Sequence, residues 1–244
     1  MNELSRDVAR VRTRVGVTQA LIATSVALLL SSTAAADSWS GTYLGGQASY
    51  AEGHSKDHSN ANASRKILYG AAGGLQAGHL WQLDNRLVLG LEAGLSLGNV
   101  ERRWKDSDIH EFSPYYGKDA MTGALLLSGK LGYAADQWLP YFTAGATLAR
   151  QKFVLGCDKS LVDQTNGCRV AEYETSASHT ALGTHVGAGV VYRFSERLSG
   201  GVEYLYNDLG SSDVTLRDPN FPDASRRSFH TDYSSVTLKV NYHF

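Results

Sequence analysis

The last ten residues of the chain are Ser235-Val-Thr-Leu-Lys-Val-Asn-Tyr-His-Phe244. Taken alternately, one set of positions carries Val, Leu, Val, Tyr and Phe, and the other carries Thr, Lys, Asn and His. Successive side chains of a β-strand point to opposite faces, so this alternation predicts a strand with one apolar and one polar face.

The same period of two recurs along the chain. It predicts eight strands, at residues 42–50, 69–81, 87–97, 121–133, 140–148, 184–194, 198–206 and 235–244. Three residues break the pattern: Leu126 and Val191 fall on polar faces, and His79 falls on an apolar one.

The connections between these strands alternate in length. Short turns at 83–86, 134–137 and 195–197 alternate with long polar links at 52–68, 98–118, 150–178 and 207–232. Membrane barrels have tight periplasmic turns and extended outer loops, whereas a soluble sandwich or lipocalin-like barrel has no reason to follow this rule. The predicted fold is therefore all-β: an eight-stranded, antiparallel, up-and-down transmembrane β-barrel with long extracellular loops.

The N-terminus has the pattern of an export signal. A basic stretch around Arg6–Arg14 precedes an apolar run at 15–30, and Ser31-Ser-Thr-Ala-Ala-Ala36 supplies small residues for cleavage. A retained transmembrane helix is the alternative, but the run is short for one. We expect a cleavable signal peptide at 1–36, export through the Sec pathway, and a barrel domain at 37–244 in the cell outer membrane.

Composition agrees with a curved sheet and excludes one class of partner. The chain has 25 Gly and 13 Tyr but only 4 Pro, and its formal net charge is −1. No basic face stands out, so no nucleic-acid partner is expected.

Aromatic residues gather near both ends of the predicted strands. They predict a girdle at the short-turn boundary of the membrane, formed by Trp39, Trp81, Trp138, Tyr192 and Tyr242. A second belt is expected near the long links, at Tyr50, Tyr69, Tyr173, Tyr206 and Tyr233.

Five charged residues fall on polar, inward faces. They are Glu92, Lys130, Arg193, Glu203 and Lys239. An eight-stranded barrel is just wide enough for its own side chains, and isolated charges there are costly, so these residues are expected to pair. An ion pathway is the alternative; we favour a lumen charge network that forms a structural plug.

The remaining candidate sites lie mainly in the long links. Cys157 and Cys168 are expected to form a disulfide, because an exported protein meets an oxidising compartment. His54 and His58 are weak metal or haem candidates, but their spacing converges only on a helix and the segment is a polar loop. His79 and His185 sit in no nucleophile signature, so neither catalytic residues nor a cofactor is predicted.

Several short motifs resemble a known family. Trp39-Ser-Gly-Thr-Tyr-Leu-Gly-Gly46, Gly187-Ala-Gly-Val190 and Val202-Glu-Tyr-Leu-Tyr-Asn-Asp-Leu-Gly210 are similar, in this order, to the small porin-like outer-membrane surface antigens of Gram-negative bacteria. Val191 and Lys130 depart from the family pattern, where Glu and Arg are common. The resemblance implies an eight-stranded, often immunogenic barrel that supports the cell envelope, and it makes Phe244 part of the signal read by the barrel assembly machinery.

The expected function is that of a structural surface antigen whose exposed loops contact external molecules. The alternatives are a narrow porin, a haem or small-ligand receptor and, least favoured, a lipid-modifying envelope enzyme. Expected partners are outer-membrane lipids and lipopolysaccharide, the assembly machinery with periplasmic chaperones, and host or small-molecule ligands.

Overall fold

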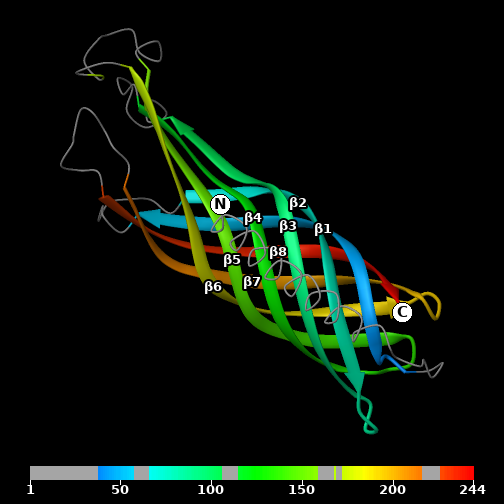
Figure 1. Cartoon of the computed structure of the whole chain (residues 1–244). Coiled ribbons are helices and arrows are strands. Elements are labelled where there is room, and N and C mark those ends of the chain that lie inside the picture. Colours follow the sequence, from blue (N-terminus) through cyan, green and yellow to red (C-terminus); the bar gives the residue numbers. More distant parts are fainter. Residues whose placement is uncertain (1–37, 58–65, 106–114, 159–167, 169–171, 216–225) are drawn as a thin grey trace, which may run out of the picture.

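The computed structural model describes residues 38–57, 66–105, 115–158, 168, 172–215 and 226–244. Eight strands close into one barrel, because β1 pairs with both β2 and β8 (Figure 1). The strands are β1 (Gly41–Asp57), β2 (Lys66–Gln82), β3 (Leu87–Lys105), β4 (Tyr115–Tyr133), β5 (Trp138–Cys157), β6 (Tyr173–Arg193), β7 (Leu198–Thr215) and β8 (Arg226–His243). Every neighbouring pair in the barrel is antiparallel, which confirms the predicted fold.

The strands are much longer than predicted. β6 has 21 residues and β5 has 20, whereas about 9–11 tilted residues cross a membrane. The described parts of the predicted long loops are therefore largely strand, and the loop prediction is wrong there. Alternation of apolar and polar residues fades where both faces of a sheet meet water, but backbone pairing continues. We call the end of the barrel with short turns the turn end, and the opposite end the loop end.

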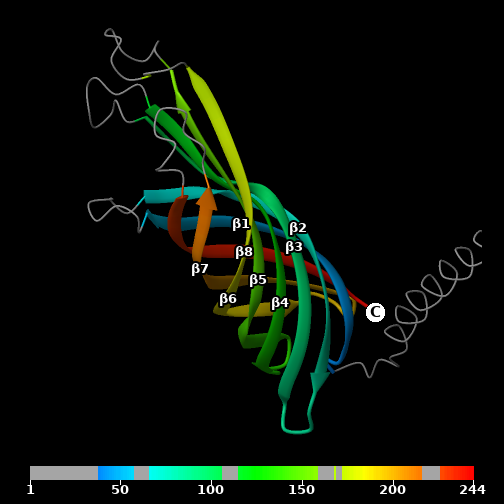
Figure 2. The ribbon, with the colours of Figure 1, turned by 60° about the vertical axis from the view of Figure 1, so that its left-hand side comes forward.

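The β5–β6 hairpin rises beyond the rest of the wall at the loop end (Figure 2). β5 and β6 stay paired as far as Cys157 and Tyr173, whereas the β6–β7 ladder stops at Thr184 and Asp208. Just beyond Asp208, β7 bulges through Gly210, whose φ of 64° favours glycine. The predicted disulfide is present and joins the end of β5, at Cys157, to Cys168.

The two faces of the wall differ sharply in chemistry. Outward side chains are apolar and exposed, as at Leu91 (61%) and Phe142 (73%), while inward ones are polar and buried, as at Gln76 (1%) and Thr147 (0%). This arrangement reverses that of a water-soluble protein and suits a lipid environment outside the barrel. Within the described residues, no helix is long and apolar enough to cross a membrane.

Most of the predicted aromatic girdle faces outward at the turn end. Trp81, Trp138 and Tyr242 are 44%, 52% and 40% exposed, and the Tyr192 ring lies 4.7 Å from that of Trp138. Trp39 is the exception, because it is only 1% exposed and its indole lies inside the turn end. It precedes β1, so strand alternation does not fix its direction.

The second aromatic belt is confirmed in part. Tyr50, Tyr69 and Tyr206 point outward near the loop end with 57%, 61% and 42% exposed, but Tyr233 is only 7% exposed and packs inside the barrel. Tyr173 lies far along the β5–β6 hairpin, opposite Cys157.

Candidate functional site

Four charged side chains meet at the middle of the barrel interior. Glu92 and Lys130 come from the neighbouring strands β3 and β4, and Glu203 and Lys239 come from β7 and β8. All four side chains are between 3% and 8% exposed. We call these four residues the interior charge cluster.

The ion pairs of this cluster run both along the wall and across the lumen. The Lys130 Nζ lies 2.7 Å from Glu92 Oε2 and 3.6 Å from Glu203 Oε2. The Lys239 Nζ lies 2.8 Å from Glu92 Oε1 and 2.6 Å from Glu203 Oε1. Each carboxylate thus contacts both ammonium groups, and the cluster as a whole is neutral.

Two phenols complete the hydrogen bonding of the carboxylates. The Tyr43 hydroxyl donates to Glu92 Oε2 at 2.6 Å, and the Tyr141 hydroxyl donates to Glu203 Oε2 at 2.8 Å. Buried charges are tolerated only when they are paired and hydrogen-bonded, and this set meets both conditions. In the sequence, these two tyrosines differ from the girdle aromatics only in falling on the inward face of their strands.

A glycine lies opposite Lys130 on the neighbouring strand. Gly90 is the register partner of Lys130, and a Cβ atom on Gly90 would lie 3.3 Å from that of Lys130 and 2.7 Å from Leu80. A larger residue would therefore displace the end of the Leu80 side chain and crowd the Cβ atom of Lys130. The glycine-rich strands bring the charged groups into one compact layer.

A second polar network lies beside the cluster, centred on His185 of β6. Ser128 Oγ lies 2.9 Å from its Nε2, and Thr147 Oγ1 lies 2.9 Å from its Nδ1 and donates to Asn207 Oδ1 at 2.9 Å. His185 is 2% exposed, and its ring is held on both sides by hydroxyl groups. Strand alternation puts His185 on the inward face of β6, but it gives no sign of the other members of the network, which come from β4, β5 and β7.

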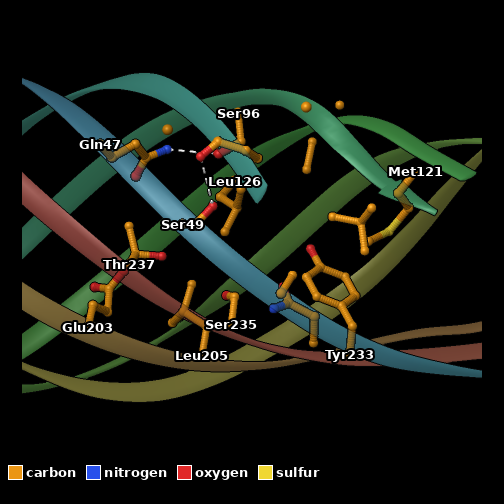
Figure 3. A pocket seen from close by; sticks show the side chains of 18 of the residues that line it. Gln47, Ser49, Ser96, Met121, Leu126, Glu203, Leu205, Tyr233, Ser235 and Thr237 are labelled. Carbon is orange, nitrogen blue, oxygen red and sulfur yellow. Dashed lines mark hydrogen bonds between the residues drawn. The ribbon is translucent and has the colours of Figure 1, made fainter. Parts of the chain in front are cut away.

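A small cavity lies between the interior charge cluster and the loop end (Figure 3). Its volume is about 60 Å³, and its walls include Gln47, Ser96, Met121, Leu205 and Tyr233. The Gln47 side-chain amide donates to Ser96 Oγ at 2.9 Å across one side of it. A cavity of this size has room for about two water molecules, since each occupies roughly 30 Å³ in the liquid.

Apolar residues close the lumen on both sides of this polar middle. Toward the turn end a buried cluster contains Trp39, Leu80, Leu139, Tyr141 and Val191. Val191, which broke the predicted polar pattern, belongs to this layer.

Toward the loop end a second buried cluster contains Leu68, Val100, Met121, Leu209 and Tyr233. The lumen is thus a sequence of apolar, charged, polar and apolar layers.

Arg193 does not join the interior charge cluster, so that part of the predicted network is wrong. Its guanidinium Cζ lies 4.0 Å from the centre of the Trp39 ring, and its Nη1 donates to the Ser38 carbonyl at 3.0 Å. It is the last residue of β6 at the turn end, far along the strand from the layer of Glu92. The alternation on β6 predicted that Arg193 points inward, but it did not predict the level of Arg193 along the barrel axis.

A larger hollow lies among the turns at the turn end. It has a volume of about 560 Å³ and is lined by residues of both charge signs, including Arg86, Asp136, Arg193 and Glu196. It shares no lining residue with the central cavity.

The other predicted sites lie on the outside or beyond the described residues. His54 Nδ1 is 3.7 Å from Asp232 Oδ2 on the outer wall, and His58 lies outside the described residues. Phe244 is 51% exposed on the lipid side, and its role as an assembly signal stays a prediction. The predicted signal peptide also falls among residues that the structure does not describe.

The comparisons with known proteins agree with this architecture. Residues 21–244 match the family model described as outer membrane protein beta-barrel domain. The chain is 30% identical over 220 residues to the 31 kDa outer-membrane immunogenic protein of Brucella melitensis, which covers 85% of this chain and 84% of that protein. It is 27% identical over 216 residues to the 22 kDa outer membrane protein of Rhizobium leguminosarum bv. viciae, covering 86% and 80% of the two chains.

Solved structures with a similar arrangement are more distant. The outer membrane protein OprG from Pseudomonas aeruginosa aligns with a TM-score of 0.45 at 14% identity, covering 84% of this chain and 96% of that one. Likenesses at this level carry no information about the interior or the loops.

Proposed function

Because the chain belongs to the outer membrane β-barrel family, we propose that it is a closed, non-conducting surface protein of the outer membrane. The interior charge cluster carries this proposal. Its four charges contact one another across the lumen, two phenols donate to its carboxylates, and apolar layers lie on both sides of it. A water-filled path would require these groups to separate.

The central cavity is too small for the receptor alternative, and the larger hollow of about 560 Å³ lies at the turn end, away from the proposed outer surface. Pockets for small molecules and cofactors are about 300–1,000 Å³, whereas the central cavity is about 60 Å³. Titration of the refolded protein with haem should give no saturable binding at one site. Saturation that disappears in a His54→Ala plus His58→Ala variant would instead support a haem receptor.

The interior gives an enzyme little support. Ser128 and His185 form a hydroxyl–imidazole pair, but the other ring nitrogen of His185 faces the Thr147 hydroxyl where a triad places a carboxylate. Neither residue lines the central cavity. The proposed role is therefore structural, with no catalytic step.

The loop end is the surface that we propose to face the outside of the cell. It carries the long strand extensions and the disulfide of the β5–β6 hairpin, both of which project beyond the apolar band. Protease added to intact cells should cut within residues 150–178, near this hairpin. Cutting only at the turns 83–86, 134–137 and 195–197 would show instead that the turn end faces the outside of the cell.

A liposome-swelling assay tests the proposed closure. Vesicles containing the refolded protein should admit small sugars no faster than empty vesicles, while a porin reconstituted in parallel admits them. Uptake that rises with the amount of this protein would favour the narrow-porin alternative.

A further inference from the structure

The outer wall of β3, β4 and β5 carries cations just beyond its lipid-facing residues. On β5, Leu148 points outward with 42% exposed, and Arg150 and Lys152 follow on the same face and are also exposed. Two residues of strand advance the chain by about 6.6–6.8 Å. The first cation therefore lies one step beyond the apolar band.

The register of the sheet gives the neighbours of these cations on the adjoining strands. Lys152 pairs with Ala120, Ala120 pairs with Glu101, and Glu101 pairs with Tyr69. Tyr69 belongs to the outward aromatic belt at the loop end, where it is 61% exposed. Strands in a barrel are tilted, so this line of partners is inclined to the membrane plane and gives the neighbours of Lys152 along the sheet. The level of the cations follows from Leu148, because Arg150 and Lys152 are the next outward residues after it on β5 and therefore lie toward the lipid headgroups.

Two more cations extend the same surface. Arg103 on β3 and Lys118 on β4 are register partners, and Glu101 accepts from Arg103 Nε at 3.1 Å and forms an ion pair with Lys118. The hydrogen bond from Lys118 holds the pKa of Glu101 below its usual value. We call Arg103, Lys118, Arg150 and Lys152 the cation patch.

The patch keeps an excess of positive charge. Glu101 is the carboxylate in ion-pair contact with it, and within the described part of the chain Arg150 and Lys152 form no ion pair. Glu174, further along the β5–β6 hairpin, accepts a hydrogen bond from Tyr116 at 2.9 Å.

The opposite wall carries different side chains near the loop end. Glu52 on β1 is the register partner of Tyr69, and His54 follows two residues beyond it. His54 lies 3.7 Å from Asp232, and His230 lies 3.6 Å from Asp208. Among the side chains that the structure describes, carboxylates and imidazoles thus lie on the outer face of β1, β7 and β8 near the loop end, while the cation patch lies on β3 to β5.

We propose that the cation patch binds the phosphate groups of a phosphorylated glycolipid in the outer leaflet. Arginine and lysine bind phosphate through charge-assisted hydrogen bonds, and partly desolvated headgroups strengthen such contacts. Neighbouring strands lie about 4.8 Å apart, so three strands present cations over about 10 Å, enough for more than one phosphate. The acyl chains of the same lipid would lie against Leu148 and the apolar band below it.

The inference rests on the proposed function in one respect: the loop end must face outside for the patch to meet the outer leaflet in cells. The binding itself is measured on purified protein and does not depend on that orientation. The full barrel, purified in detergent, is titrated with bis-phosphorylated lipid A in mixed micelles. The test variant is Arg150→Gln plus Lys152→Gln. The matched control, His54→Gln plus His230→Gln, changes two side chains on the opposite wall near the loop end. Parallel titrations use dephosphorylated lipid A and a soluble sulfated heparin oligosaccharide.

The test variant should lose affinity for bis-phosphorylated lipid A by about tenfold, while the control stays within about twofold of the parent. Dephosphorylated lipid A should bind weakly and equally to all three proteins. Equal lipid A affinity in the test variant and the parent would overturn the proposal. So would an equal loss in both variants, or a patch-dependent affinity for heparin without one for lipid A. Failure of the protease test in cells would leave this binding result unchanged, so the two proposals can fail separately.

Discussion

Glutamate and lysine pair in two regions of this barrel, under opposite conditions of solvent exposure. In the interior charge cluster the Lys239 and Glu92 side chains are 3% and 5% exposed. On the outer wall at the loop end, Lys118 and Glu101 are 31% and 25% exposed. The same chemistry therefore has different consequences: removing one buried partner leaves an uncompensated charge, whereas an exposed partner is replaced by water.

The largest expected effect comes from breaking the interior charge cluster. A Lys239→Met substitution leaves Glu92 and Glu203 to share Lys130 alone, and should lower the free energy of unfolding by about 3–5 kcal/mol. Urea titration of the protein in lipid vesicles, read by heat-modifiable migration on gels, measures this loss.

The matched control for that substitution adds Glu203→Gln to Lys239→Met. This double variant restores charge balance, so it should be more stable than Lys239→Met alone. A double variant that is less stable by the sum of both single losses would show that the two residues do not act as a pair.

The next effect concerns the disulfide of the β5–β6 hairpin. Cys157 and Cys168 are separated by 11 positions, and loss of such a loop closure lowers the free energy of local opening by about 2–3 kcal/mol. A Cys157→Ser plus Cys168→Ser variant should be cut faster by protease within residues 150–178. Its global unfolding should change less, because Cys157 lies at the far end of β5, beyond the interior layers. Equal cleavage rates in the variant and the parent would show that the disulfide does not stabilise the β5–β6 hairpin.

Substitution of Trp39 should have a smaller effect on stability, and it tests whether this indole lies inside the barrel or faces lipid. Its indole Nε1 donates to the Asp136 carbonyl at 3.2 Å, so Trp39→Phe should cost about 1 kcal/mol. Brominated lipids should quench the fluorescence of Trp81 and Trp138, which face lipid, but not that of Trp39. Trp81→Phe is the control, and it should reduce the quenchable fraction. If Trp39→Phe reduces that fraction instead, Trp39 belongs to the girdle.

The smallest effect is expected on the outer wall. Glu101→Gln should change the free energy of unfolding by less than about 1 kcal/mol, because its ion pairs are exposed. The pKa of Glu101 is lowered in the folded protein, so its contribution is present above pH 4.5, its ordinary value, and is lost as the pH falls below it. Urea titrations at pH 7 and pH 3 should differ less in the variant than in the parent. If Glu101→Gln lowered the free energy of unfolding as much as Lys239→Met does, the buried and exposed ion pairs would not differ in their contribution to stability.

Strand alternation was enough to predict the number of strands, their order and the inward direction of the four clustered charges. It could not predict how far the strands continue, because beyond the lipid both faces are polar and the alternation disappears. β6, predicted at 184–194, begins at Tyr173 for this reason.

Height within the lumen was the second quantity missing from the sequence. Arg193 points inward as predicted, but its level on β6 depends on the stagger between strands, and it contacts Trp39 at the turn end. Trp39, before the first strand, had no alternation to fix its side. The phenols of Tyr43 and Tyr141 and the partners of His185 also depend on contacts across the lumen.

Single-channel recording of the refolded protein in a planar bilayer tests the closure of the lumen most directly. The parent should give no discrete conductance steps, because four paired charges and two apolar layers occupy the path. The Lys239→Met plus Glu203→Gln variant, which removes two ion-pairing groups, is recorded beside it as the more open comparison. Regular, ohmic steps from the parent protein would contradict the account.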